Sequence, residues 1–394
     1  MGQYWVRIRP IPQIMKIAVA SAFLGHVLRG VEAWAQDLAA ELHRRGLDVT
    51  LFQGGGPGDV PYAQHIRCPD HTDPFWKHVT RFTRHGLWRV GLGSPLHLQQ
   101  VVFGRRVARE LRSGNFDVVH TQDAGTALVL EKMRRAGQHP AKVIFANGTE
   151  EPLEFLLQFK HVQELAPYYL EIDRQKGLPA DRQWFSIGNF VDCDVYKPGN
   201  RAKAREKLGI PRDRFVVFDV AALKVTHKRI DWLAKEVAIA RQKHPEIMLI
   251  VAGATTPETE QVDHAIRKFL GEDAWVFKNI PRKHMPDLYR AADVFAHAAL
   301  SEMFAIVLLE AGACGIPLRG HTFPVIEWVI GPGGVCLDME SPGELALSLI
   351  ESYENPDLRA QRGRNARQST AERFGTAHVV DEIVNMYEAV LKNR

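Results

Sequence analysis

Apolar and polar positions along the first half of the chain follow a strand, helix, strand order. Lys16–Ala20 is a short apolar run, apolar residues from Val31 to Leu42 recur at helical spacing, and Asp48–Phe52 is apolar again. Short joints between these segments predict a βαβ unit, whose crossover connects parallel strands. Further near-continuous apolar runs, typical of strands buried on both faces, are Asp117–Thr121, Lys142–Ala146 and Trp184–Gly188.

The same alternation restarts in the second half of the chain. Between the two halves lies Asn189–Arg205, whose Asp, Pro and Gly residues suit a domain boundary. We therefore expect an α/β protein of two doubly wound, Rossmann-like domains that face each other across a cleft. In the second half the pattern predicts strands at Phe215–Ala221, Ile247–Ala252, Trp275–Lys278 and Asp293–His297, and helices at Trp232–Lys243 and Glu302–Gly315.

Composition agrees with a folded protein in water. The chain has 394 residues, enough for two cores, with 45% apolar and 24% charged residues. The longest apolar runs, such as Ile247–Ala252, are far short of the ~20 residues of a membrane span, and residues 1–14 lack a signal-peptide pattern. The four cysteines are scattered without C-x-x-C spacing, which favours reduced thiols in a cytoplasmic protein over a disulfide framework or a zinc site.

Two glutamates eight residues apart, Glu302 and Glu310, mark the last predicted helix. At ~1.5 Å of rise per residue their carboxylates would lie about 12 Å apart, with the positive helix N-terminus beside Glu302. N–H groups there suit phosphate oxygens, and carboxylates accept hydrogen bonds from hydroxyls, so the pair can hold a sugar joined to a diphosphate. Taken alone, the spacing is more common in an ordinary amphipathic helix with one exposed and one buried glutamate.

Five motifs in a fixed order resemble family 4 of the retaining glycosyltransferases, which have the GT-B architecture. The similarity runs from about Met15 to Arg394. The motifs are Arg29-Gly-Val-Glu32, Asp117-Val-Val-His-Thr121, Ile187-Gly-Asn-Phe-Val-Asp192 and Lys228-Arg-Ile-Asp231. The fifth is the E-x7-E element from Glu302 to Glu310, which continues as Glu310-Ala-Gly-Ala-Cys-Gly-Ile-Pro317.

The resemblance implies a division of the chain into four parts. Residues 1–14 would be an N-terminal extension, 15–190 the acceptor-side domain, and 191–375 the nucleotide-sugar-binding domain. Apolar residues from Val379 to Leu391 recur at helical spacing. Residues 376–394 would accordingly form a helix that packs back on the first domain.

The resemblance also implies roles for single residues. Glu302 would contact hydroxyls of the donor sugar and Glu310 the nucleotide ribose, since ionised carboxylates are strong acceptors. Lys228 would neutralise the departing diphosphate, with Lys224 or Arg229 sharing that work. Gly30 would let the backbone approach a phosphate, although a plain turn glycine is an equally good interpretation.

His120 ends an apolar strand at a position that we expect to face the cleft. In the family a histidine in this stretch lies near the donor sugar and the acceptor, so we predict a catalytic role for His120. Many members carry a second histidine two positions later, where this chain has Gln122. Asp123 is the reserve candidate.

Several departures from the family pattern affect the expected donor site. Its Glu-Gly-Phe-Gly is here Glu302-Met-Phe-Ala305, which loses both glycines. Met303, Phe304 and Ala305 would still offer N–H donors to the diphosphate if φ stays negative. Ala222 replaces the arginine of the family's Gly-Arg-Leu stretch, so one diphosphate cation is lost or is supplied by Lys224.

Two further motifs bear on metals and cofactors. Asp192-Cys-Asp194 spells the D-x-D signature of metal-dependent transferases, but at the expected hinge we interpret it as an aspartate capping a turn. Gly54-Gly-Gly56 is turn material, and no G-x-G-x-x-G follows the first strand, which counts against a dehydrogenase. We expect no metal requirement and no cofactor.

The resemblance implies transfer of a hexose from a UDP- or GDP-sugar to a hydroxyl of an unknown acceptor, with retention at the anomeric carbon. Such reactions build glycans, glycolipids and glycoconjugates. Two alternatives stay open: an inactive relative that binds a nucleotide sugar, and a GT-B epimerase or phosphorylase.

Positive charge is concentrated between His65 and Asn115, where nine Lys and Arg residues face three acidic ones. Trp76, Phe82 and Trp88 interleave with these cations, and residues 76–112 have three interpretations. The first interpretation is a peripheral contact with an anionic inner membrane face, and the second is a pocket for an anionic acceptor. The third is a solvated face whose aromatics lie in the core. Nucleic acid is not expected as a partner, because the rest of the chain is slightly acidic.

Overall fold

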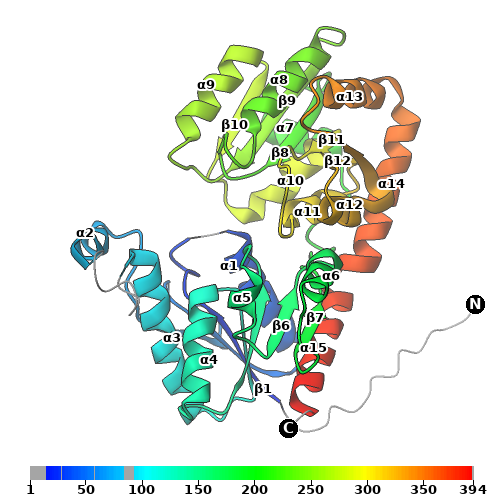
Figure 1. The fold of residues 1–394 in the computed structure, drawn as a ribbon. Helices are drawn as coiled ribbons and strands as arrows, with labels where there is room; N and C mark the ends of the chain where they lie inside the picture. The colour runs from blue at the N-terminus through cyan, green and yellow to red at the C-terminus, as the bar shows by residue number, and fades with distance from the viewer. Residues whose placement is uncertain (1–14, 28, 57, 84–92, 393–394) are drawn as a thin grey trace, which may run out of the picture. The chain divides into compact units, whose positions relative to one another are not determined.

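The computed structural model describes residues 15–27, 29–56, 58–83 and 93–392, and the chain divides into two compact units. The first contains residues up to 165, residues 170–186 and residues 383–394. The second contains residues 166–169 and 187–382. Each unit is built on one parallel sheet with helices over both faces (Figure 1).

The sheet of the first unit has the strand order β3-β2-β1-β4-β5-β6-β7. Its strands are β1 (Lys16–Ser21), β2 (Asp48–Gln53), β3 (Ala63–His65), β4 (Val118–Thr121), β5 (Lys142–Asn147), β6 (His161–Glu164) and β7 (Gln183–Ser186). The helices in this part of the chain are α1 (Gly30–Arg44), α2 (Pro74–Thr83), α3 (Pro95–Ser113), α4 (Ala124–Arg135), α5 (Leu153–Leu156) and α6 (Pro167–Gln175).

The sheet of the second unit has the order β10-β9-β8-β11-β12-β13. Its strands are β8 (Phe215–Val220), β9 (Ile247–Gly253), β10 (Ala274–Lys278), β11 (Val294–Ala296), β12 (Leu318–His321) and β13 (Gly334–Leu337). The helices are α7 (Arg201–Leu208), α8 (Ile230–Arg241), α9 (Thr259–Leu270), α10 (Met285–Ala291), α11 (Ile306–Ala313), α12 (Pro324–Ile330), α13 (Glu344–Glu354) and α14 (Pro356–Phe374). The last helix, α15 (Thr376–Lys392), begins in the second unit and ends in the first.

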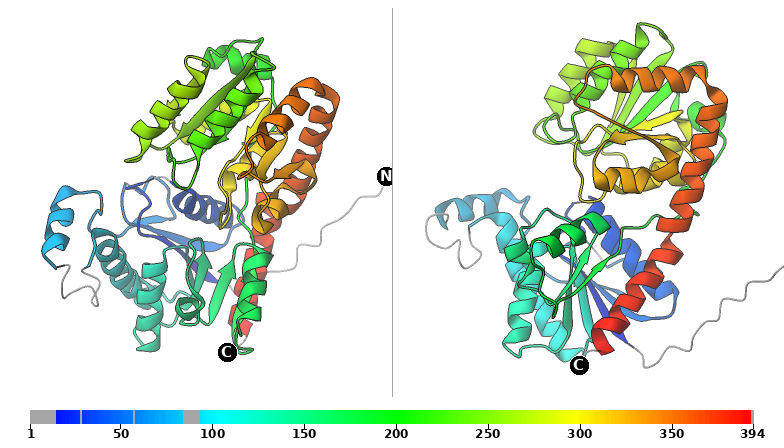
Figure 2. Two further views of the ribbon diagram at one scale, coloured as in Figure 1. Left: turned by 45° about the horizontal axis from the view of Figure 1, so that its top comes forward. Right: turned by 45° about the vertical axis from the view of Figure 1, so that its right-hand side comes forward.

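Alternation along each buried strand builds two apolar layers, one on each face of a sheet. In the second unit, Val217, Leu249 and Val251 belong to a core with residues of α8, α9 and α13, while Phe218 packs edge-on against Tyr289 of α10 on the other face. Figure 2 shows these helices on the two faces of the sheet. The expectation of two doubly wound, Rossmann-like sheets is therefore confirmed.

Four strands were not predicted from the pattern: β3, β6, β12 and β13. In β6 the sequence His-Val-Gln-Glu is mostly polar, yet all four residues are buried. In β12 the fully buried Arg319 donates to the hydroxyl of Ser348 at 2.6 Å. In β6 and β12, polar side chains with partners inside the protein take the place of apolar ones, so no hydrophobic run marks these two strands.

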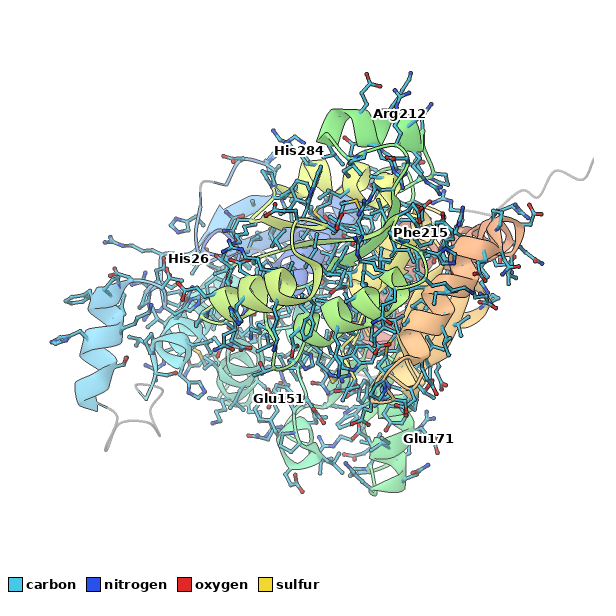
Figure 3. All side chains as sticks on the ribbon, turned by 90° about the horizontal axis from the view of Figure 1, so that it is seen from above. His26, Glu151, Glu171, Arg212, Phe215 and His284 are labelled. Atoms are coloured by element: carbon cyan, nitrogen blue, oxygen red, sulfur yellow. The ribbon has the colours of Figure 1, made fainter. Side chains whose placement is uncertain are left out.

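A buried aspartate anchors the amino end of β11. Asp293, 4% exposed, accepts hydrogen bonds from Arg205 (2.6 Å) and Arg201 (2.7 Å) of α7 and from the backbone N–H of Val216 (2.8 Å). Val216 is the second residue of β8, which begins at Phe215, labelled in Figure 3. One carboxylate thus ties α7 to the two central strands.

We predict that Asp293→Asn lowers the free energy of unfolding by about 3 kcal/mol, because it leaves the buried Arg205 guanidinium without its anion. The control is Asp287→Asn, which removes a more exposed carboxylate paired with Lys207 and should cost about 1 kcal/mol or less. Urea unfolding of the full chain measures both. Equal losses for the two variants would contradict the anchoring role of Asp293.

Candidate active site

The strand order of the second sheet reverses between β8 and β11. Strands β9 and β10 lie on one side of this pair, and β12 and β13 lie on the other. In open parallel sheets, ligands bind at the carboxyl ends of the strands where the order reverses. The loop of residues 221–229 leaves β8 at this point and the loop of residues 297–305 leaves β11, so these two loops define the candidate site.

Glu302 is the centre of the contacts between the two loops. One of its oxygens, Oε1, accepts hydrogen bonds from the ammonium of Lys228 and from Nε2 of His297 at 2.9 Å, and Nε2 of His227 lies 3.7 Å away. The other oxygen, Oε2, accepts no hydrogen bond within the described part of the chain. The side chain is 13% exposed, so a ligand can reach this free oxygen.

Two buried residues, His297 and Asp219, connect Glu302 to the strands of the second sheet. The imidazole of His297 directly follows β11 and is 1% exposed, and its Nδ1 lies 3.0 Å from Oδ1 of Asp219 on β8. Burial alone would lower the pKa of His297, but the carboxylates of Asp219 and Glu302 outweigh it and raise this pKa to about 9. Burial alone would raise the pKa of Glu302, but the nearby imidazole of His227, the hydrogen bond and charge of His297, and the charge of Lys228 hold this pKa well below its usual value.

Sequence reasoning missed both His297 and Asp219. Each lies in or at the end of a predicted apolar strand, where a polar residue breaks the run. A charged residue inside a buried parallel strand needs a partner, and that requirement is the signal that could have pointed to them.

The predicted helix geometry of the two glutamates is wrong. The helix begins at Ile306, with Ala305 as its N-cap, so Glu302 lies in the loop and not at the helix mouth. Contacts of the side chains hold this loop out of the helix. Glu302 is bound to Lys228 and His297, and the ring of Phe304 packs edge-on against Trp328 and Phe374.

The loop nevertheless presents backbone donors. Ala305 has φ −84°, and Met303 and Phe304 are absent from the residues with positive φ in the described part of the chain. The N–H groups of Met303, Phe304 and Ala305 find no acceptor among the described residues. They lie directly before the N-terminus of α11, where the helix dipole favours anions.

Glu310 lies apart from this cluster. It is on α11, is 8% exposed, and its Oε2 accepts a hydrogen bond of 2.6 Å from the phenol of Tyr289 on α10. The ring of Tyr196 packs edge-on against Tyr289, and burial together with the charge of Glu310 raises the pKa of Tyr196. The contact of Glu310 with a ribose stays a prediction.

The loop after β8 carries the other predicted cations. Lys224 is half-buried, and its ammonium makes no hydrogen bond within the described residues. Arg229 has φ +52°, which strains a residue with a Cβ, and it donates to the carbonyl of Met339 at 2.7 Å and lies over the ring of Trp232. Arg229 therefore shapes the start of α8, and its sharing of the diphosphate stays a prediction.

The expectation that His120 faces a cleft is wrong. Its side chain is fully buried in the first unit, where Nδ1 lies 2.7 Å from the hydroxyl of Tyr387 on α15 and the ring packs edge-on against Trp34 on α1. Alternation along β4 points Val119 toward the core with α3 and α4, so His120 points to the opposite, helix-covered face. Burial lowers the pKa of His120 to about 3.

The carboxyl ends of β1 and β4 form the corresponding reversal in the first unit. The reserve candidate, Asp123, lies there, and its Oδ2 accepts from the backbone N–H of Ala22 at 2.5 Å. Burial raises the pKa of Asp123 to about 7. Gly30 is the exposed first residue of α1, next to Arg29, whose guanidinium binds the buried carboxylate of Glu32 at 2.7 Å.

Two turn motifs take the roles that their sequences favour. Asp192 Oδ1 accepts hydrogen bonds from the backbone N–H groups of Asp194 (2.8 Å) and Val195 (3.1 Å), so the D-x-D sequence is a capped turn, as interpreted. The glycine run lies against the loop after β1, where a Cβ on Gly54 would come within 2.0 Å of the carbonyl oxygen of Ala22.

Comparison with known families matches both halves of the chain. Residues 28–193 match the model of glycosyltransferase family 4, and residues 200–369 match the glycosyl transferases of group 1. A D-inositol 3-phosphate glycosyltransferase of Acidothermus cellulolyticus is 30% identical over 93% of this chain and 86% of its own length. One of Thermobispora bispora is 24% identical over 92% and 90%.

Solved structures share the fold. The sucrose-phosphate synthase of Thermosynechococcus elongatus superimposes with a TM-score of 0.78 at 18% identity, over 96% of this chain and 100% of its own. The Anabaena protein Alr3699/HepE, solved with UDP and glucose, gives 0.72 at 17% identity over 95% and 100%.

Two doubly wound parallel sheets define the GT-B fold, and the family matches define the class of protein as a glycosyltransferase. The chain belongs to glycosyltransferase family 4.

We predict that His120 is structural. Tyr387→Phe and His120→Phe each remove the hydrogen bond between these residues and should lower the free energy of unfolding by about 1–2 kcal/mol, with kcat unchanged within about twofold. The folded protein keeps His120 neutral down to pH about 3, whereas the unfolded chain protonates it below about 6.5. Stability therefore falls as the pH drops through this window, and it should fall less in His120→Phe.

Urea unfolding across pH and initial-rate assays measure these effects. A His120→Phe enzyme that is as stable as Tyr387→Phe but has lost turnover would restore the catalytic interpretation.

Proposed function

We propose that the protein transfers a hexose from a nucleoside-diphosphate sugar to an acceptor hydroxyl, with retention at the anomeric carbon and without a metal ion. The observation that carries the proposal is Glu302: an ionised carboxylate at the reversal of the second sheet, with one oxygen neutralised and the other free. The names of the relatives, D-inositol 3-phosphate glycosyltransferases, support a sugar-transfer reaction.

The free Oε2 of Glu302 is suited to accept a hydrogen bond from a hydroxyl of the donor sugar. The N–H groups of Met303, Phe304 and Ala305 are available to bind an anion before the start of α11, and Lys228 and Lys224 supply positive charge from the loop after β8. Together they stabilise the diphosphate as it departs, and this stabilisation lowers the barrier. Attack from the same face, with the leaving phosphate taking the proton of the acceptor, then gives retention.

UDP-sugars are the first donors to test, because the structurally similar HepE has been solved in complex with UDP and with UDP-glucose. A phosphorylated inositol is the first acceptor to test, because it stands in the names of the relatives. Glu310 would contact the ribose of the donor if it released Tyr289.

We predict that the protein converts a UDP- or GDP-sugar to the nucleoside diphosphate and a glycosylated acceptor. Glu302→Gln should reduce kcat/KM at least tenfold through loss of a charged hydrogen bond, and Lys228→Ala about a hundredfold through loss of charge on the leaving group. Glu260→Gln and Lys235→Ala, at exposed positions of the same unit, are the matched controls and should keep full activity. Product is measured by mass spectrometry with and without EDTA, which should leave the rate unchanged.

Wild-type rates in both site variants would refute the assignment. Donor binding by calorimetry without any product would instead identify an inactive binding relative. A reaction that requires inorganic phosphate, or one without an acceptor, would identify a phosphorylase or an epimerase. Activity lost with EDTA and restored by Mg²⁺ or Mn²⁺ would overturn the metal-free mechanism.

We also propose that α2 and α3 bring the enzyme to an anionic membrane surface at the inner face of the membrane. Phe75 of α2 is 61% exposed, beside Trp76 and the exposed Lys77. Arg84, Trp88 and Arg89 lie outside the described residues, as do the side chains of Arg81 and Phe82. Exposed arginines follow on α3: Arg105, Arg106, Arg109 and Arg112. An aromatic beside cations is the pattern of an interfacial helix, and no helix among the described residues is long and apolar enough to cross a bilayer.

We predict that the protein floats with vesicles containing phosphatidylserine but not with phosphatidylcholine vesicles. Phe75→Ser should reduce the bound fraction about threefold or more, since it removes an exposed aromatic side chain that would become buried in the membrane interface. Leu347→Ser changes an apolar residue of the second unit that is 69% exposed and serves as the control. Absence of binding to either vesicle, or equal loss in the two variants, would contradict the membrane contact.

A further inference from the structure

Asp219, His297 and Glu302 form a continuous chain of hydrogen bonds from the interior of the second sheet to the candidate site. Asp219 is fully buried and His297 is 1% exposed, while Glu302 at the outer end is 13% exposed. The two ring nitrogens of His297 face one carboxylate oxygen each, at 3.0 Å and 2.9 Å.

This geometry fixes the protonation state of the ring. A carboxylate is an acceptor without protons to donate, so a nitrogen that bonds to it must carry a proton. His297 bonds to two carboxylates and therefore carries both protons as an imidazolium. With Lys228 the four groups sum to zero charge, as burial of ionised groups requires.

His297 and Lys228 differ in what else they can do. Lys228 has a long flexible side chain on a loop, and under the proposed mechanism it moves to the diphosphate of the donor. The side chain of His297 is short and buried, and both of its ring nitrogens are hydrogen-bonded, so it cannot move to the diphosphate with Lys228. When Lys228 leaves Glu302, His297 is the cation that stays on Oε1.

We propose that His297 is a positioning residue: held by Asp219, it keeps Glu302 ionised and directs the free Oε2 to a hydroxyl of the donor sugar. The inference rests on the proposed function and adds two residues to it, Asp219 and His297. The ligand group that this site would bind is a sugar hydroxyl, which donates a hydrogen bond to the ionised carboxylate of Glu302.

The proposal has a consequence for pH. The titratable groups that contact His297 are Asp219 from β8 and Glu302 from its own loop, while Lys228 and His227 from the loop after β8 contact Oε1 of the same Glu302. The pKa of His297 is raised to about 9, above its value in the unfolded chain, so its contribution is complete below pH about 6.5 and is lost as the pH rises through 9. Donor binding should therefore weaken on the alkaline side.

The first experiment needs no activity. In the full-length protein labelled with ¹⁵N-histidine, both ring nitrogens of His297, assigned by comparison with His297→Gln, should be protonated at pH 7.5 and should titrate near pH 9. Asp219→Asn keeps the shape but removes the charge, so this titration should move down by about one pH unit or more. A ring with one bare nitrogen at pH 7.5, or an unchanged titration in Asp219→Asn, would overturn the proposal.

The second experiment separates positioning from support of the fold. His297→Gln should raise the KM or Kd for the UDP-sugar donor that the wild type uses about tenfold or more, and His297→Lys, which restores a cation, should recover part of the loss. His264→Gln, on the exposed face of α9, is the control and should bind like the wild type. Thermal unfolding of each variant tests whether it is folded. In Asp219→Asn, the rise of the donor KM on the alkaline side should begin at a lower pH than in the wild type.

The outcomes separate this inference from the proposed function. If no donor is bound or converted by the wild type, the proposed function fails while the ¹⁵N titration still decides the protonation state of His297. If the wild type converts a donor and folded His297→Gln binds it equally well, the proposed function stands and the positioning role is refuted.

Discussion

A carboxylate held almost out of water can remain ionised only if cations meet it, and this constraint shapes the candidate site. Glu302 is 13% exposed, and the ammonium of Lys228 and the imidazolium of His297 both bond to one of its oxygens, with the ring of His227 3.7 Å from the same oxygen. They come from both loops that leave the reversal of the second sheet, so the ion cluster also fixes the loops to each other. Loss of one partner leaves a buried charge unpaired, which makes the cluster a single unit rather than a set of separate contacts.

The departures from the family pattern differ in what they remove from the candidate site. Ala222 replaces an arginine of the family, and Met303 and Ala305 replace two glycines. At Met303 and Ala305 the backbone keeps negative φ and N–H groups that find no acceptor among the described residues, so the loss of the two glycines removes no donor. Ala222, in contrast, removes the cation that the family's arginine supplies. Arg229 occupies a left-handed conformation that favours glycine. Its hydrogen bond to the carbonyl of Met339 and its contact with the ring of Trp232 offset the strain.

The fold could be predicted from the sequence, but the site only in part. Apolar runs such as Ile247–Ala252 mark strands because a buried parallel strand has no polar face. Strand β6 was not predicted because its polar, buried Glu164 interrupts the apolar pattern, and the hydrogen-bond donor that accommodates it, Asn147, lies 17 residues away in sequence. Motifs placed Glu302 and Lys228 together. They could not show that His120 turns toward α15, or that Asp219 and His297 meet, because such contacts depend on strand pairing and alternation across the sheet.

The two sheets reverse their order in the same way, yet the groups at the two reversals differ. In the second unit His297 and Lys228 bond to an ionised Glu302, and the N–H groups of Met303, Phe304 and Ala305, which follow it in the chain, find no acceptor among the described residues. In the first unit Asp123 has a pKa raised to about 7 by burial, so near neutral pH it can hold or release a proton. One topology, repeated along the chain, thus provides two electrostatic environments, because burial acts on directly bonded ion pairs in one unit and on a carboxyl group bonded to a backbone N–H in the other.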